Sequence, residues 1–172
     1  PAASARSKTD AAYKQEAMEA VVKIQKGVRG YHALWKHIMD ISLPDVKKNY
    51  ADLDVEFDLW KGESDAGPLI PDVVELLEKS GLTYESEGAL VVDVKEETDT
   101  KEIPPCIILK SDGAALYATT DLATIKDRMD SLQADSLIYL ADKRQEMHFL
   151  QVFRVARKAG IVSPETKMTH IG

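Results

Sequence analysis

Apolar residues recur at three- and four-residue spacing along the N-terminal part of the chain. The first stripe consists of Tyr13, Ala17, Val21, Ile24 and Val28, and the second consists of Tyr31, Leu34, Trp35, Ile38 and Met39. This is the period of an α-helix, and Gly27 and Gly30 weaken the helix between the two stripes. The pattern predicts two packed helices. It also predicts a frayed lead-in over residues 1–11 and a further short helix, capped by Ser42, that runs through Pro44.

The period of the pattern changes twice in the middle of the chain. Over residues 54–60, Val55, Phe57 and Leu59 alternate with acidic residues, which predicts a half-buried strand. A helical period follows over residues 70–77 and should end at Gly81, because glycine suits the left-handed position after a helix. Residues 82–94 then predict a β-hairpin whose turn lies near positions 87 and 88.

Strands and helices alternate from Ile103 to the end of the chain. Short strands are predicted over residues 104–110 and 114–118, and the second leads directly into a helix that Thr119 and Thr120 cap. The apolar run 136–141 indicates a strand covered on both faces, and a helix over 145–158 should end at Gly160. The sequence thus predicts an α/β domain over residues 103–172, preceded by a mostly helical and α+β region over residues 1–102.

Charge is distributed unevenly along the chain, whose net charge is −7. Basic residues outnumber acidic ones nine to five over residues 1–50, whereas acidic residues outnumber basic ones sixteen to four over residues 51–102. The remaining 70 residues are nearly neutral. Since a polyanion would be repelled by the acidic middle, contacts with nucleic acid should come from the basic N-terminal helices or the C-terminal part.

Other features of the composition exclude several classes of protein. A single cysteine, Cys106, excludes an intrachain disulfide framework and a cysteine metal cluster. No apolar run approaches the roughly 20 residues that a membrane span needs, and no signal segment opens the chain, so we expect a cytoplasmic protein. The acidic residues between positions 85 and 99 fit no calcium-loop spacing, and we expect a solvated loop and no metal site.

Polar side chains follow two of the predicted strands. Tyr117 lies near the end of the strand at 114–118 and Asp121 follows it, and Gln145 and His148 come after the strand at 136–141. Ligands of open α/β sheets bind at such strand-to-helix junctions. A carboxylate beside a phenol suits a cationic planar group, so the pattern predicts a site for a guanidinium or an amine. Alternatively, Asp121 only caps a helix and Tyr117 packs in a strand core.

Several ordered segments resemble the catalytic domain of the arginyl-tRNA synthetase family, a class I synthetase family. Two of them are KSDGAALYATTDLATIKDR at 110–128 and IYLADKRQEMHFLQVFRVARKAG at 138–160. Upstream, LWKHIMDISL, FDLWKGES and IPDVVELLEKSGLTYESEGALVVDV follow the family in the same order, so the resemblance covers residues 13–172. It implies a partial Rossmann-like parallel sheet. Residues 1–102 would be the insertion between the Rossmann halves, near the tRNA acceptor end.

The resemblance also assigns roles to individual residues. Its Y-x-T-x-D motif implies that Tyr117 and Asp121 recognise the arginine guanidinium, and its Q-x-x-H motif implies that Gln145, with His148, positions the amino acid. His170 and Gly172 match an H-x-G segment that borders the nucleotide. The H-x-G-H and K-M-S-K-S type motifs that handle ATP phosphates do not occur in the chain. No catalytic residue is therefore expected within it.

The resemblance implies a ligase whose substrates are arginine, ATP with Mg²⁺, and arginine-specific tRNA. The chain would be an excised internal fragment, inactive alone and without a bound ligand, that supplies specificity for arginine. A different class of function is also compatible with the residues, namely a non-catalytic α/β module that binds arginine, another cation or a protein partner. Upstream and downstream ATP motifs in the full reading frame would distinguish the two.

Overall fold

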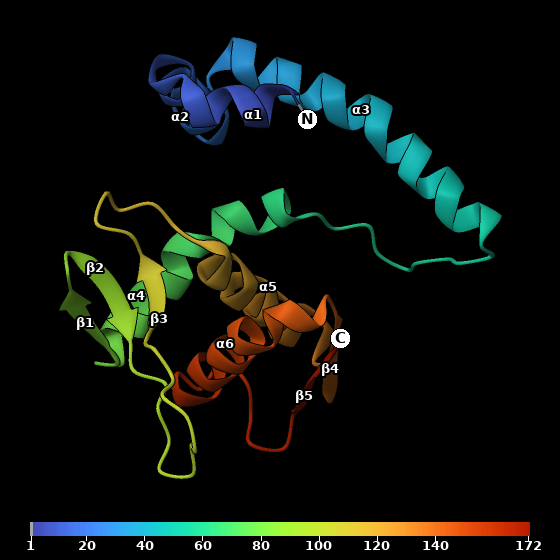
Figure 1. Cartoon of the computed structure of the whole chain (residues 1–172). Coiled ribbons are helices and arrows are strands. Elements are labelled where there is room, and N and C mark those ends of the chain that lie inside the picture. The colour runs from blue at the N-terminus through green and yellow to red at the C-terminus, as the bar shows by residue number, and fades with distance from the viewer. Residues whose placement is uncertain (1) are drawn as a thin grey trace. The chain divides into compact units, whose positions relative to one another are not determined.

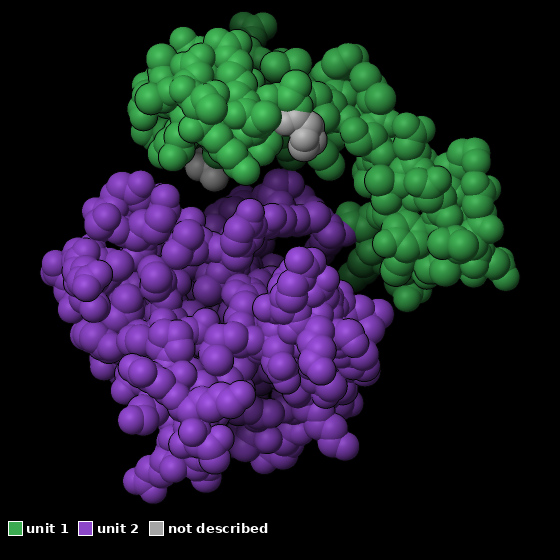
Figure 2. Space-filling model, viewed as in Figure 1, with its two compact units in different colours: residues 1–60 green, residues 61–172 purple. Residues whose placement is uncertain are grey.

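The computed structural model describes residues 2–172, apart from the side chain of Gln25 (Figure 1). The chain divides into two compact units, residues 1–60 and residues 61–172, which Figure 2 colours separately. The predicted division between residues 102 and 103 lies inside the second unit. That division was expected between an inserted segment and the second half of a catalytic domain, which need not coincide with compact units. It therefore stays a prediction.

The first unit consists of helices and one extended segment. Its helices are α1 (Ala2–Thr9), α2 (Ala11–Gln25) and α3 (Arg29–Asp52). Over residues 2–9 the predicted frayed lead-in is wrong, since α1 is a helix in a segment rich in alanine, the strongest helix former. Pro1, which the prediction also included, lies outside the described residues. The predicted separate helix at Ser42 is also wrong, because α3 continues through Pro44. Proline removes one backbone donor, and ion pairs of Lys36 with Asp40 and Lys48 with Asp52 support the turns on either side.

Residues 54–60 do not form the predicted strand. In the part of the chain that the structure describes, no strand pairs with them, and they run as an extended segment after α3. Phe57 and Trp60 instead pack edge-to-face against Tyr50, with ring centroids 4.7 and 5.8 Å from the Tyr50 ring. Of the three alternating apolar residues, Phe57 therefore joins a small aromatic cluster, whereas Val55 and Leu59 are exposed.

The second unit contains all the strands of the described chain. Its elements are η1 (Glu63–Leu69), α4 (Ile70–Lys79), β1 (Thr83–Ser86), β2 (Ala89–Val92), β3 (Cys106–Leu109), α5 (Tyr117–Leu132), β4 (Ser136–Leu140), η2 (Lys143–Gln145), α6 (Glu146–Lys158) and β5 (Lys167–Ile171). Strands β1, β2 and β3 form an antiparallel sheet in that order, and β4 pairs with β5 in parallel. The α/β class is confirmed, and helix α6 connects the two parallel strands (Figure 1).

Local turn chemistry was predicted correctly in this unit. The β1–β2 hairpin turns at Glu87 and Gly88, whose φ angles of 51° and 78° are left-handed. Helices α4 and α6 are followed by Gly81 and Gly160, with φ angles of 68° and 66°. A side chain is strained in that region, so glycine specifies where each helix ends.

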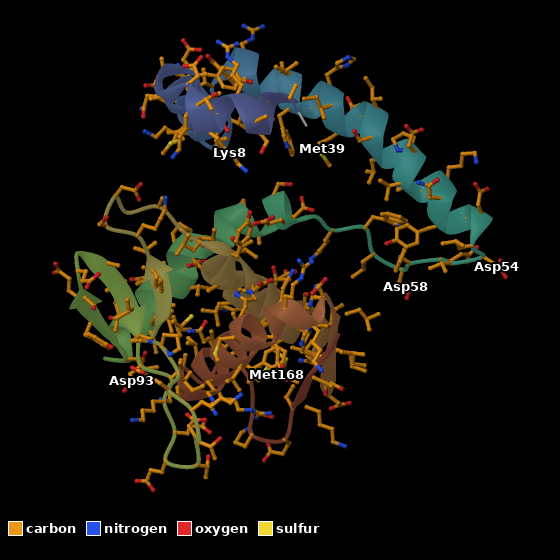
Figure 3. The ribbon with its side chains drawn as sticks, in the orientation of Figure 1. Lys8, Met39, Asp54, Asp58, Asp93 and Met168 are labelled. Atoms are coloured by element: carbon orange, nitrogen blue, oxygen red, sulfur yellow. The ribbon has the colours of Figure 1, made fainter. Side chains whose placement is uncertain are left out.

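Helices α4, α5 and α6 enclose the core together with the strands. The largest fully buried apolar side chains come from these helices, from β2 and β3, and from the loop after β2; they are Leu77, Ile108, Leu122, Ile125, Val73, Val92, Val94, Val152 and Val155. Strand β5 contributes Met168, which packs against this cluster and is labelled in Figure 3. None of the described helices is both long and apolar enough to cross a lipid bilayer.

The predicted strand at 114–118 is replaced by the start of a helix. Only Ala115 bridges to β3, opposite Leu109, and α5 begins at Tyr117. Thr119 does not cap the helix. Its buried hydroxyl lies in the first turn and donates to the carbonyl of Ile108, which attaches α5 to β3. Tyr117 is therefore a helical residue.

Strand β4 is present as predicted, but it is not covered on both faces. Leu137 and Tyr139 face the core, whereas Ile138 and Leu140 are 62% and 79% exposed. Ile171, paired with Leu140, is also exposed. The outer face of the β4–β5 pair is therefore apolar and open in this chain, which differs from the expected parallel sheet with two covered faces.

A guanidinium from α6 holds the acidic loop that follows β2. Arg154 Nη1 and Nη2 donate to the two carboxylate oxygens of Asp99, both at 2.7 Å, and Nη1 also donates to the Val94 carbonyl at 2.9 Å. Glu96 lies 3.4 Å from Nη2. The expectation that this loop is merely solvated is thus incomplete, because Asp99 is mostly buried in an ion pair. The bidentate bond lowers the pKa of Asp99 from 3.8 to about 2.

This ion pair predicts a specific acid dependence of stability. The pKa of Asp99 is lower in the folded chain than in the unfolded chain, so its contribution is complete above about pH 4 and falls as the pH approaches 2. We expect Asp99→Asn to lower the melting temperature at pH 6 and to flatten its fall between pH 4 and pH 2. Thermal unfolding across this range measures it, with exposed Asp93→Asn as the control (Figure 3). A parallel slope in wild type and Asp99→Asn would contradict the prediction.

Candidate arginine site

Asp121 and His148 form the centre of the candidate site. Asp121 lies in the second turn of α5 and His148 in the first turn of α6, and these helices pack together. His148 Nε2 lies 2.6 Å from Asp121 Oδ2, where the ring N–H donates to the carboxylate. Both side chains remain partly exposed, at 26% and 30%. Asp121 is therefore not a helix cap, and its carboxylate is accessible to a ligand.

Tyr117 lies on the same face of α5, one helical turn before Asp121. Residues four apart on a helix are neighbours, and the Tyr117 side chain is 71% exposed. The alternative in which Tyr117 packs in a strand core is therefore wrong. The structure brings a phenol and a carboxylate to one accessible helix face, as the cation-site interpretation requires.

Gln145 is the residue at which η2 passes into α6. Its backbone N–H donates to the Asp142 carbonyl at 2.8 Å, and the Asp142 side chain accepts from the backbone of Arg144 at 2.9 Å. These bonds hold the exposed turn between β4 and α6. Gln145 precedes His148 by three residues, so the two side chains lie along one face of the helix start.

The two strand-to-helix junctions of the predicted site do not belong to one sheet in the described chain. Tyr117 follows β3, which pairs antiparallel with β2, whereas Gln145 follows β4, which belongs to the other sheet. The α5–α6 contact, rather than a shared strand edge, brings the Asp121 and His148 side chains together. The residues were predicted, but the element that joins them was not.

A groove of about 320 Å³ adjoins Tyr117 on the β3 side. Its walls include Pro104, Pro105 and Leu116, and Gln151 Nε2 donates to the Pro104 carbonyl at 2.8 Å. Cys106 also lines it, but burial raises the pKa of this thiol to about 12. The thiol is therefore protonated at neutral pH, and this wall offers apolar contact rather than a nucleophile.

Tyr139 is a neighbour of the site that the sequence pattern did not single out. Its hydroxyl is buried and has no hydrogen-bond partner among the described residues. Burial raises the pKa of Tyr139, the Asp121 carboxylate raises it further, and the Arg128 guanidinium, 5.0 Å from the ring centroid, opposes them. In the sequence, the position of Tyr139 within the predicted strand at 136–141 is the signal that could have indicated its place beside the site.

The two predicted nucleotide contacts lie at the end of β5. His170 Nε2 donates to the Ala141 carbonyl at 3.0 Å, and its ring stacks on Phe149 with centroids 4.8 Å apart. At Gly172, an added Cβ would lie 2.7 Å from Lys143 Cα. The strand end thus approaches the β4–η2 turn too closely for a larger residue. The assignment of His170 and Gly172 to a nucleotide site stays a prediction.

The surrounding architecture is that of class I aminoacyl-tRNA synthetases. The structure superposes on an arginyl-tRNA synthetase from Plasmodium falciparum with a TM-score of 0.80 and 26% sequence identity. The match covers 93% of this chain and 28% of that one. The family model for "tRNA synthetases class I (R), catalytic domain" matches residues 2–172, and the chain therefore belongs to this arginine-specific family. The resemblance recognised from the ordered motifs is confirmed.

Curated relatives carry the same family assignment. Arginine–tRNA ligases from Agathobacter rectalis and Alkaliphilus oremlandii are 60% and 51% identical over all 172 residues of this chain. A third, from Hyphomonas neptunium, is 48% identical. The chain spans 29% of the length of each of these relatives.

Proposed function

We propose that this chain is part of the catalytic domain of an arginine–tRNA ligase and supplies the surface that selects the arginine side chain. The observation that carries the proposal is the accessible face of α5, where Tyr117 and Asp121 lie one turn apart beside His148. Relatives that are arginine–tRNA ligases match the entire chain, which supports the same assignment.

Each predicted side chain has a chemical role in this proposal. The Asp121 carboxylate accepts charge-assisted hydrogen bonds from the guanidinium, and the Tyr117 hydroxyl supplies a second, directed acceptor. Gln145 positions the amino acid from the start of α6, and His148 holds the Asp121 carboxylate in place. A planar cation with several N–H donors fits this set better than a point-like ammonium does.

The whole protein would then join arginine to tRNA in two steps. In the first step the arginine carboxylate would attack the α-phosphate of Mg²⁺-bound ATP and displace pyrophosphate, which gives arginyl-adenylate. In the second step a terminal tRNA hydroxyl would accept the arginyl group, and AMP would leave. Catalysis of this kind depends on positioning and electrostatic stabilisation, and this chain would contribute positioning. We further propose that Gly172 borders the nucleotide, that residues 1–102 form the insertion near the tRNA acceptor end, and that the enzyme works in the cytoplasm.

Discrimination between arginine and citrulline tests the proposed function directly. Citrulline has nearly the shape of arginine but lacks its charge, so a site built on Asp121 should reject it. We expect arginine to support ATP–pyrophosphate exchange in the full-length protein, with kcat/KM for citrulline lower by at least about a thousandfold. Exchange with citrulline at a comparable rate would contradict charge recognition.

The reading frame around the chain provides an independent check. The proposal expects an H-x-G-H motif upstream and a K-M-S-K-S type loop downstream. Arginine binding without arginine-dependent exchange in the full-length protein would instead favour the non-catalytic binding module.

A further inference from the structure

His170 is joined to the turn that carries Gln145. Its ring lies at the inner face of β5, opposite Tyr139 in the β4–β5 register. His170 Nε2 donates to the Ala141 carbonyl at 3.0 Å, while the Ala141 N–H donates to the Ile171 carbonyl at 3.1 Å. Both backbone groups of Ala141 are thus held by β5. The next bond along the chain, from the Gln145 N–H to the Asp142 carbonyl, continues this support to the start of α6.

A second series of contacts joins His170 to Asp121. The His170 ring stacks on Phe149 with an interplanar angle of 21°. Phe149 is buried, and its ring meets the His148 ring edge-on, with centroids 5.1 Å apart and an angle of 74°. His148 Nε2 in turn holds Asp121 Oδ2 at 2.6 Å. Three rings in direct contact therefore separate the end of β5 from the carboxylate of the site.

We propose that His170 is a positioning residue for the arginine site. Through Ala141 it fixes the turn that carries Gln145, and through Phe149 it fixes the ring of His148 against Asp121. The inference rests on the proposed function, because it presupposes that Asp121 and Gln145 contact arginine. In a close-packed interior, replacing one side chain shifts its neighbours. A small displacement of the groups that bind a substrate weakens the binding measurably.

This role differs from the nucleotide contact expected from the H-x-G match. The His170 N–H at Nε2 is already used by the Ala141 carbonyl, so its bond stabilises protein rather than ligand. A nucleotide ligand and a positioning residue also have opposite kinetic signatures. Loss of a nucleotide contact raises KM for ATP, whereas misplacement of Asp121 and Gln145 raises KM for arginine.

Two substitutions separate the contacts of His170. His170→Phe keeps a ring that can stack on Phe149 but removes the donor to Ala141, and His170→Gln keeps an N–H donor but removes the ring. We expect each to raise KM for arginine roughly fivefold, the equivalent of one hydrogen bond or ring contact, with KM for ATP unchanged within about twofold. Arginine-dependent ATP–pyrophosphate exchange in the full-length enzyme measures both constants. Thr169→Ala, on the exposed outer face of the same strand, is the control.

Phe149→Leu tests the ring series without altering His170 or Ala141, and it carries the test if a His170 variant does not fold. It should give the same selective rise in KM for arginine. If the His170 ring acts through Asp121, the effect of His170→Gln, which removes that ring, should largely disappear in an Asp121→Asn background, because the two substitutions remove one coupled unit. A purely structural role would give additive effects and a general loss of folded enzyme.

Two results would overturn the inference. One is a rise in KM for ATP with KM for arginine unchanged, which would make His170 a nucleotide ligand. The other is wild-type kinetics in His170→Phe while Asp121→Asn weakens arginine binding. The proposed function fails on a different result, namely an unchanged KM for arginine in Asp121→Asn.

Discussion

Asp121→Asn is expected to lower kcat/KM for arginine by about 100-fold in the full-length enzyme. The substitution keeps the size of the side chain and removes its charge, so a bound guanidinium would lie beside a neutral amide. The amide also presents an N–H group where a carboxylate oxygen accepted a bond from His148. Steady-state exchange kinetics with arginine as the varied substrate measure the effect.

Asp130→Asn is the matched control for this prediction. Asp130 lies on the same helix but is exposed, and among the described residues it forms an ion pair with Lys126. It therefore has the same charge as Asp121, nine positions further along the helix. Its removal should leave kcat/KM for arginine within about twofold of wild type, because exposed helix pairs contribute little. Equal kinetics in wild type and Asp121→Asn would show that Asp121 does not recognise the substrate charge.

Leu122→Ala is expected to lower the free energy of unfolding by about 3 kcal/mol. Leu122 is fully buried, next to Asp121 in sequence, and it anchors α5 in the core. Truncation removes buried apolar surface and leaves a cavity that the packed helices fill only partly. Chemical denaturation of the chain, followed by circular dichroism, measures the change.

Leu132→Ala provides the comparison on the same helix. Leu132 ends α5 and is 56% exposed, so its truncation should change the free energy of unfolding by no more than about 0.5 kcal/mol. Equal losses in the two variants would mean that α5 is not anchored through Leu122.

Elements with local signals were predictable from the sequence. The hairpin turn at Glu87 and Gly88 and the helix ends before Gly81 and Gly160 depend on backbone angles that few residues adopt. The strand expected at 54–60 failed for the opposite reason. Alternation of apolar and polar residues indicates that a segment could be half-buried, but a strand also needs a partner strand. In this segment the aromatic rings pack on Tyr50 instead.

In the candidate site, too, some features could be predicted from a local motif and others could not. Tyr117 and Asp121 could be proposed because the five-residue motif Y-x-T-x-D is visible in the sequence. The bond between His148 and Asp121 spans 27 positions and depends on how α5 packs against α6. The ring series through Phe149 to His170 likewise depends on the β4–β5 register, which no local pattern specifies.

The open outer face of β4 and β5 has a consequence for handling the protein. Ile138, Leu140 and Ile171 present neighbouring apolar side chains on a sheet of only two strands, each with an edge that can accept another strand. Contact between two such faces removes apolar surface from water without any change in the fold. We therefore expect self-association of the isolated chain through this face to increase with protein concentration.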